Sequence, residues 1–170
     1  LNIDAAYNNR GFAHRSVGKY NEAIIDFNKA IELNPKNDSA YKNRGMAHIL
    51  LGKINEAFVD YNKAIALNPK NQEARFFRGT INSAFGKYNE AIIDFNKAIE
   101  LNPKDGLAYY SRAASYSIAG NPKESIQDLK KAIQLNRTFR NDAKNDKIFD
   151  NIRNTKEFKK LIGDHGEPRK

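Results

Sequence analysis

The 170-residue sequence contains no cysteine and no tryptophan, and it has a single methionine. Without cysteine the chain has neither a disulfide framework nor a thiolate site, which is compatible with oxidising and reducing compartments alike. It also lacks any run of about 18 apolar residues, the length that a membrane-spanning helix needs. The chain opens at Leu1 without a basic and then apolar start, so we expect that a signal peptide was removed or never present. We therefore expect a soluble protein, with cytoplasmic and periplasmic locations both open.

Acidic residues are in deficit, with 20 Asp and Glu against 29 Lys and Arg and a formal net charge of +9. Such a balance raises the possibility of nucleic acid or an acidic partner. The excess is spread along the chain, because residues 137–170 carry 10 basic against 6 acidic side chains and residues 1–136 carry 19 against 14. A diffuse excess does not predict a basic patch.

The sequence does contain a repeat of 34 residues. The segment 18–36 recurs letter for letter at 86–104, two periods later, and 52–70 is a close variant of it. The same pattern returns with more drift at 120–135. Four repeats follow, at residues 4–37, 38–71, 72–105 and 106–139.

Each repeat has the pattern of two short helices. Apolar residues recur at spacings of three and four, as at Ala23, Phe27 and Ala30, and strict alternation is absent. The residues that end or begin helices recur as well: a glycine after the first helix, a proline after the second, and Asn or Asp as the cap of the next. They are Gly18, Gly52, Gly86 and Gly120, then Pro35, Pro69 and Pro103, then Asn37, Asn71 and Asp105.

These residues resemble the tetratricopeptide repeat (TPR) family, whose 34-residue unit carries an aromatic, a Leu-Gly pair, Tyr, Ala, an aromatic and Pro at fixed spacing. The first repeat matches at Tyr7, Gly11, Ala23, Phe27, Ala30 and Pro35. The third has Arg75 where the first aromatic belongs. The fourth departs most, with Ala113, Ser125, Leu129 and Arg137 in place of Gly, Ala, the aromatic and Pro.

The resemblance implies an all-α fold, a right-handed α-solenoid of four helix-turn-helix repeats. Residues 140–163 break the period but stay amphipathic, and a solenoid must cover its last apolar face, so we expect them to form a helical cap. Thr155 is a plausible start for one of its helices. The predicted domain is 1–163, and we expect residues 164–170 to be a disordered tail.

Two charged columns lie on the helix faces that pack inward. Because a buried guanidinium needs a carboxylate, we expect each arginine to pair with the aspartate of its own repeat, or alternatively with that of the preceding repeat. An anion-binding stripe is the functional alternative, but the carboxylates would neutralise it. The expected structural ion pairs are Arg10 with Asp26, Arg44 with Asp60, Arg78 with Asp94 and Arg112 with Asp128.

No pattern points to catalysis, a metal or a cofactor. His14 and His48 lie one period apart, but their column continues as Asn82 and Tyr116, so no further ligand follows. Nothing places a nucleophile beside a base, and no glycine-rich phosphate loop occurs. We expect half-buried histidines, no catalytic residue, no metal, no cofactor and no enzyme activity.

Two further columns lie on the second helices. We expect lysines on the outer face to pair with the aspartates three residues before them; these are Lys29, Lys63, Lys97 and Lys131. Extra apolar residues stand at Ile25, Val59 and Ile93. We expect these to be partly buried at a helix seam, with self-association through them as the alternative.

In folds of this family the first helices line a concave groove that binds peptides. By resemblance the lining here is Asn8, Phe12, Arg15, Lys42, Asn43, Met46, Ile49, Phe76, Phe77, Thr80, Tyr110, Ser111 and Ala114. Phe12, Phe76 and Tyr110 are the expected anchors. The best-known family mode clamps a carboxylate of heat-shock chaperones with Lys, Asn and Arg. Asn43 suits it, but Phe12, Glu73 and Phe77 replace three of its polar residues.

We therefore predict a protein–protein interaction scaffold that binds a peptide segment of a partner in this groove. The alternative is a helical-repeat protein that binds nucleic acid or another polyanion. Base recognition by such repeats uses the same few positions in every repeat, whereas the lining here differs from repeat to repeat. That variation favours a peptide.

Overall fold

A computed structural model describes residues 3–163. Within that range the chain forms eleven α-helices and one short 3₁₀ helix, with no strand. The helices are α1 Ile3–Ser16, α2 Tyr20–Leu33, α3 Asp38–Leu50, α4 Ile54–Leu67, α5 Gln72–Ala84, α6 Tyr88–Leu101, α7 Gly106–Ile118, α8 Pro122–Leu135, α9 Phe139–Asn145, η1 Lys147–Phe149, α10 Asp150–Arg153 and α11 Lys156–Ile162. The predicted all-α solenoid of helix pairs is confirmed. The expected tail, 164–170, lies outside the described residues.

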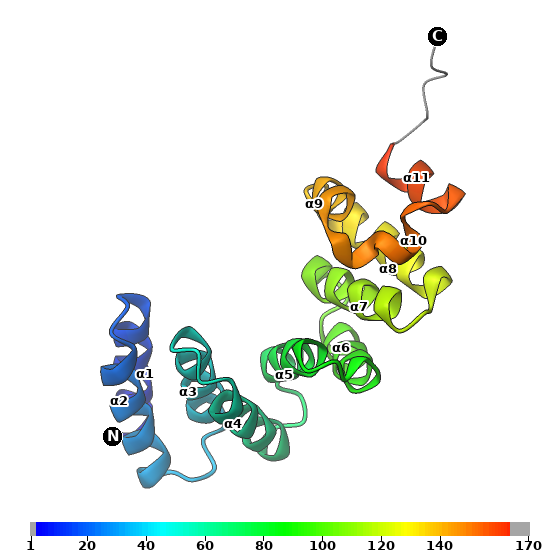
Figure 1. The fold of residues 1–170 in the computed structure, drawn as a ribbon. Coiled ribbons are helices and arrows are strands. Elements are labelled where there is room, and N and C mark those ends of the chain that lie inside the picture. The colour runs from blue at the N-terminus through cyan, green and yellow to red at the C-terminus, as the bar shows by residue number, and fades with distance from the viewer. Residues whose placement is uncertain (1–2, 164–170) are drawn as a thin grey trace. The chain divides into compact units, whose positions relative to one another are not determined.

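The chain forms two compact units, Leu1–Ile81 and Asn82–Lys170, called here the N-terminal and the C-terminal unit. The boundary falls inside the third repeat, near the end of α5. In the N-terminal unit α2 packs on both α1 and α3, and α3 packs on α4. In the C-terminal unit α7 packs on both α6 and α8, and the helices after α8 pack on this pair (Figure 1).

The turn inside each helix pair depends on the backbone conformation of one glycine. Gly18 has a φ of 80° and Gly52 one of 72°, in the left-handed region that other residues rarely adopt. A Cβ placed on either glycine would meet no atom within 4 Å. Backbone conformation, and not lack of space, therefore requires glycine here.

The turn between repeats uses side-chain caps, as the sequence predicts. The Asn37 side chain accepts a hydrogen bond from the Ala40 N–H, and Asp105 accepts from Leu107 and Ala108. Asn37 also donates to Asp4 at 3.0 Å, so one amide both begins α3 and ties the turn to α1. Each of these bonds satisfies a backbone or side-chain group that would otherwise lack a partner within the protein.

Small residues let the paired helices approach closely. A Cβ on Gly11 in α1 would lie 2.7 Å from Phe27 Cε1 in α2, which is closer than two carbons can pack. In the fourth repeat the corresponding pair is Ala113 and Leu129, both fully buried. Relative to the first repeat, alanine replaces the smaller glycine and leucine replaces the larger phenylalanine. The two changes compensate each other in volume where the helices cross.

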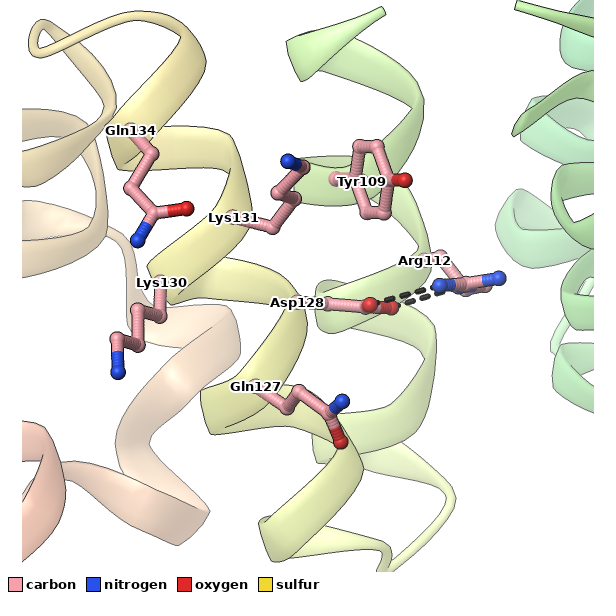
Figure 2. Close-up of a pocket in the computed structure, with 7 residues that line it drawn as sticks. All are labelled: Tyr109, Arg112, Gln127, Asp128, Lys130, Lys131 and Gln134. Atoms are coloured by element: carbon pink, nitrogen blue, oxygen red, sulfur yellow. Dashed lines mark hydrogen bonds and ion pairs between the residues drawn. The ribbon is translucent and has the colours of Figure 1, made fainter. Parts of the chain in front are cut away.

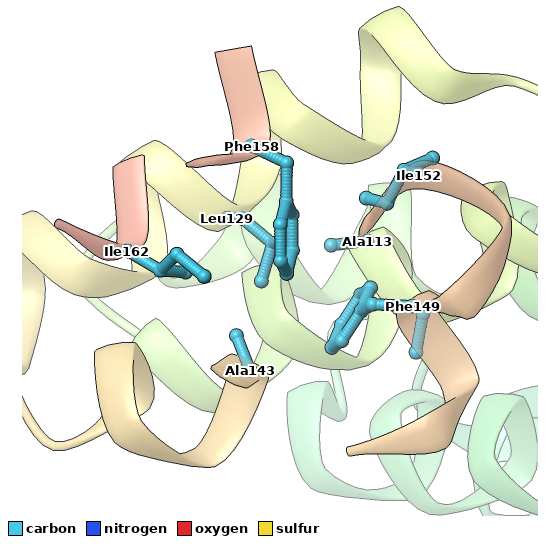
Figure 3. Close-up of a cluster of buried hydrophobic side chains, with 8 residues drawn as sticks. Ala113, Leu129, Ala143, Phe149, Ile152, Phe158 and Ile162 are labelled. Atoms are coloured by element: carbon cyan, nitrogen blue, oxygen red, sulfur yellow. The ribbon is translucent and has the colours of Figure 1, made fainter. Parts of the chain in front are cut away.

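Residues 139–162 form the cap on the C-terminal unit. Its apolar side chains join Leu129 of α8 and the alanines of α7 in one buried cluster (Figure 3). The buried members are Ala113, Ala114, Leu129, Ala143, Phe149, Ile152, Phe158 and Ile162. Thr155 begins α11 by accepting from the Phe158 N–H, as predicted. Burial of this cluster is what holds the aperiodic segment against the last helix pair.

Candidate functional site

The N-terminal unit carries a pocket between the first helices of three successive repeats, called here the α1–α3–α5 pocket. Its volume is about 110 Å³, and its lining residues are Phe12, Arg15, Lys42, Asn43, Met46, Glu73 and Phe77. Six of these seven belong to the groove lining expected from the sequence, and Glu73 is the addition. The repeat brings them together because each first helix presents the same face to the same side.

Aromatic side chains supply the apolar part of the pocket. Phe12 is 49% exposed, and the Arg15 guanidinium lies 4.9 Å from the centre of its ring. Phe77 stacks on the buried Tyr61 at 5.7 Å, and Phe76 meets Phe77 edge to face at 5.3 Å. Phe12 is thus open to a partner, whereas the Phe77 ring is fixed by its stacking on Tyr61.

The polar part of the pocket is already hydrogen-bonded. Lys42 Nζ lies 2.6 Å from Glu73 Oε2, and Asn43 donates to Asn8 Oδ1 at 3.0 Å. Asn43 is buried, so it holds α3 against α1 instead of facing solvent. Two cations against one carboxylate leave the pocket with an excess of positive charge.

Tyr61 contributes a buried phenol beneath these residues. Its hydroxyl has no hydrogen-bond partner, and burial raises the pKa of the phenol well above its usual value. The phenol therefore stays neutral where it stacks on Phe77.

The other expected lining residues of the N-terminal unit are not part of the pocket lining. Ile49 packs against the apolar cluster around Ala57 and Tyr61, so it belongs to the core. Thr80 is exposed, and its hydroxyl donates to the Phe76 carbonyl within the same helix.

In the C-terminal unit the structure differs from the expected open groove. Tyr110 packs between Phe139 and Phe149, and its hydroxyl donates to Asp146 at 3.2 Å. Burial beside Asp146 raises the pKa of Tyr110. Ala114 is buried in the cap cluster, and the Ser111 carbonyl accepts from Ser115. The cap packs on this face of α7, so Tyr110 is partly buried against it instead of lining an open groove.

The charged columns form pairs within the repeats. Arg112 donates to both oxygens of Asp128 at 2.6 and 2.7 Å (Figure 2). Arg44 pairs in the same way with Asp60, at 2.6 and 3.0 Å. The side chains of Arg112 and Arg44 are 17% and 21% exposed. Each arginine is therefore already neutralised by its carboxylate, which leaves no free anion-binding stripe at these two positions.

The first pair differs in its exposure. Arg10 donates to Asp26 at 2.5 and 2.9 Å, but its side chain is 61% exposed, in contrast to the burial expected from the sequence. Hydrogen bonding to Arg10 lowers the pKa of Asp26. Arg78 and Asp94 belong to different units, and their pairing stays a prediction.

Sequence reasoning missed a third partner in this ladder. Arg44 also donates to Asn28 of α2 at 2.6 Å, and Arg112 donates to Asn96 of α6 at 2.7 Å. Each arginine therefore joins the second helix of one repeat to both helices of the next. The signal was present, because Asn28, Asn62 and Asn96 recur at the 34-residue period.

The remaining columns have local roles. His14 Nδ1 lies 3.2 Å from Asp26 Oδ2, and His48 Nδ1 lies 3.1 Å from Asp60 Oδ2. Burial lowers the pKa of His48. Each histidine thus contacts the aspartate that its own repeat already uses for arginine, and residues 3–163 hold no cluster of three or more side chains suited to a metal.

The outer columns differ from expectation in two ways. Lys29 pairs with Glu32 at 2.8 Å, three residues after it and not before, because Asp26 is occupied by Arg10. The apolar stripe is not partly buried: Ile25, Val59 and Ile93 are 66%, 65% and 64% exposed. Exposure of this kind leaves self-association as an untested alternative.

Comparison with known proteins identifies the class. Three family models described as tetratricopeptide repeat match residues 5–37 and 39–71, 72–105, and 95–127. The chain belongs to the tetratricopeptide repeat family. No curated protein matches the sequence significantly. None of the described helices has the length and apolar character needed to cross a membrane.

Several solved structures are similar. MamA from Desulfovibrio magneticus RS-1 is 18% identical with a TM-score of 0.79, covering 95% of this chain and 90% of that one. Pseudomonas aeruginosa pilF is also 18% identical, with a TM-score of 0.76 and coverage of 98% and 78%. The first TPR of Spaghetti (RPAP3), bound to the HSP90 peptide SRMEEVD, is 29% identical with a TM-score of 0.66 and coverage of 69% and 93%. The first two likenesses concern the fold alone.

Proposed function

We propose that this protein is an interaction scaffold whose α1–α3–α5 pocket binds a peptide segment of a partner protein. TPR proteins are in general scaffolds for protein interactions, and the similar Spaghetti domain is bound to a peptide. The observation that carries the proposal is the exposed Phe12 beside Phe77 and Met46, next to a small set of polar groups. Apolar anchors with few polar contacts are typical of peptide grooves.

The partner of this pocket differs from a carboxylate-clamped chaperone tail. Of the clamp positions inferred from the family, Asn43 is present but is buried against Asn8. Glu73 is an acid where the clamp has a cation, and it already pairs with Lys42, so this position supplies no cation for a terminal carboxylate. We therefore propose an internal segment of a partner as the ligand.

The test is selection of binding peptides from a random displayed library on the immobilised full chain, followed by affinity measurements. We expect selected peptides to lose about 2 kcal/mol, roughly thirtyfold in affinity, in Phe12→Ala. Val59→Ala is the control, because Val59 is also an apolar residue that is largely exposed but lies on α4. The Val59→Ala variant should bind the selected peptides with the affinity of the wild type.

Salt dependence separates this proposal from polyanion binding. Peptide affinity should change little between low and high salt, whereas affinity for a polyanion falls steeply through counterion release. The affinity of a ligand could instead be unchanged by substitution of Phe12 and Phe76 and fall when Lys29, Lys63 and Lys97 are neutralised. The binding surface would then lie on the second helices. That result would reject the pocket.

A further inference from the structure

The C-terminal unit carries a second pocket between α7 and α8, called here the α7–α8 pocket (Figure 2). Its volume is about 480 Å³, and its lining residues are Tyr109, Arg112, Gln127, Asp128, Lys130, Lys131 and Gln134. Arg112 and Asp128 neutralise each other, because both carboxylate oxygens accept from the guanidinium. Lys130 and Lys131 are therefore the unbalanced charges of this pocket.

These two lysines lack the partner that the preceding repeat provides. Lys97, one period before Lys131, pairs with Glu100 at 2.5 Å. In the fourth repeat Gln134 stands in place of that glutamate. Lys130 and Lys131 are both exposed, and neither forms an ion pair with another residue of the range 3–163. Their charges are thus free to meet a ligand.

The basic excess, diffuse over the whole chain, is concentrated at this place. Residues 129–141 carry four basic and no acidic side chains. The corresponding residues of the first three repeats, 27–39, 61–73 and 95–107, carry two basic side chains each, against two, one and two acidic ones. The other two cations of the segment, Arg137 and Arg140, are exposed and also form no ion pair with a described residue. Such a cluster produces a local positive potential that attracts acidic ligands.

We propose that the α7–α8 pocket binds an acidic segment of a partner protein, a stretch with two or more neighbouring Asp or Glu residues. Figure 2 shows Lys131 extending toward Tyr109 and Lys130 pointing away from α7, so a ligand that contacts both lies across α8. An extended segment can place a carboxylate on each lysine, whereas a single small anion would meet one of them. The amides of Gln127 and Gln134 can donate to and accept from the backbone of the segment.

Nucleic acid is the competing ligand, because phosphates also pair with lysine. Single-stranded nucleic acid gains much of its affinity from stacking of its bases on aromatic rings. The aromatic residue of this lining, Tyr109, is half-buried and already has the Arg112 guanidinium 5.5 Å from the centre of its ring. The pocket therefore offers charge and amide groups, which suit a peptide, and little surface for stacking.

The experiment is a titration of the full chain at low salt with three labelled probes. They are a peptide of six glutamates, the same peptide with glutamines, and a single-stranded DNA of six nucleotides. We expect the glutamate peptide to bind, the glutamine peptide not to bind, and the affinity to fall as salt is added. Absence of binding by the glutamate peptide overturns the proposal. Tighter binding of the DNA that depends on Lys130 and Lys131 would assign the pocket to nucleic acid and overturn it as well.

Substitution of the two lysines locates the binding. Lys130→Gln combined with Lys131→Gln should weaken binding of the glutamate peptide about tenfold. The matched control is Lys29→Gln combined with Lys97→Gln, which removes the same net charge at positions where the lysine is paired with a glutamate. This control should leave the affinity nearly unchanged. Equal losses in the two double variants would mean attraction to the net charge of the chain alone and would overturn the assignment.

Gln134→Glu is a second test, and it keeps both lysines. It restores the glutamate that the third repeat has, so Lys131 should pair within α8 and the glutamate peptide should bind more weakly. Unchanged affinity would overturn the contact with Lys131. Phe12→Ala should not alter this affinity, so failure of the present proposal is distinguishable from failure of the α1–α3–α5 pocket. Circular dichroism of each variant checks that the helices are intact.

Discussion

Arg44 illustrates how single residues hold this fold together. Its guanidinium binds both oxygens of Asp60 and also the Asn28 amide, so three helices meet at one side chain. The planar guanidinium group can make these bonds at once because its donors point in fixed directions. Arg10 makes the same bond to its aspartate, but among the described residues no earlier repeat lies beside it.

This difference predicts unequal losses when the aspartates are removed. Asp60→Ala should lower the free energy of unfolding by about 3 kcal/mol, because Arg44 would be left largely buried without a carboxylate to balance its charge. Asp26→Ala should cost clearly less, because Arg10 is mostly exposed and stays hydrated. Urea denaturation of both variants measures this. Equal losses would show that burial of the arginine does not set the cost.

A second residue-scale prediction concerns pH. Burial, together with Arg44, lowers the pKa of His48 below 6.5, although Asp60 and Glu56 act in the opposite direction. Below pH 6.5 the unfolded chain then binds more protons at this histidine than the folded chain does. The contribution of His48 to the free energy of unfolding is therefore fully present above that pH and is lost as the pH drops towards the lowered pKa.

His48→Asn places at this position the residue that the third repeat already has, where Asn82 donates to Asp94 at 3.3 Å. Between pH 7 and 5.5 the variant should lose less unfolding free energy than the wild type. Parallel curves for the two proteins would contradict the assignment. At still lower pH both should lose stability, since hydrogen bonds lower the pKa of Asp4 and of Asp26 in the folded state.

At the scale of elements, the helix pair is the unit that packing specifies. Its crossing depends on a small residue in the first helix and a large one in the second, and the fourth repeat changes both together. Gly11 with Phe27 and Ala113 with Leu129 are two solutions to the same spatial constraint.

A double-mutant cycle tests this reading. Gly11→Ala should lose about 1 kcal/mol net, because overpacking against Phe27 outweighs the better helix propensity of alanine. Phe27→Leu alone should lose stability by leaving a cavity. The double variant should lose less than the sum by about 1 kcal/mol, as measured by chemical denaturation. Additive losses would mean that the two positions do not share one space.

At the scale of the whole molecule, the covering of the last helix pair matters most. Repeat arrays are stabilised by neighbour contacts, so a terminal pair that lacks a neighbour exposes its apolar face. Here the aperiodic cap supplies the neighbour, with Phe149, Ile152 and Phe158 buried on α7 and α8.

Truncation after residue 138 should therefore expose Leu129 and Tyr110 and destabilise the C-terminal unit. We expect a lower thermal midpoint and new binding of a hydrophobic dye, with the helices α1–α4 still formed. An unchanged midpoint without dye binding would show that the cap is dispensable for folding. Ile25→Ser serves as a control, because that side chain is already exposed.

The sequence alone determined the helices, their pairing into four repeats and the residues that begin and end them. It could do so because these features depend on local spacing, on glycine, proline and cap residues, and on a period that repeats letter for letter. It also placed together the residues of the α1–α3–α5 pocket, since identical repeats present identical faces.

Only the tertiary structure decided which of those faces are open. The cap does not share the period of the repeats, so no local pattern indicated that it lies on Tyr110. The face that it covers depends on where the Phe149 side chain packs against apolar surface. The exposure of Arg10 and of Ile25 depends likewise on which helices lie next to them. Burial depends on which residues are neighbours in space. The sequence of a repeat predicts the same burial for every copy, whereas tertiary packing gives the copies different surroundings.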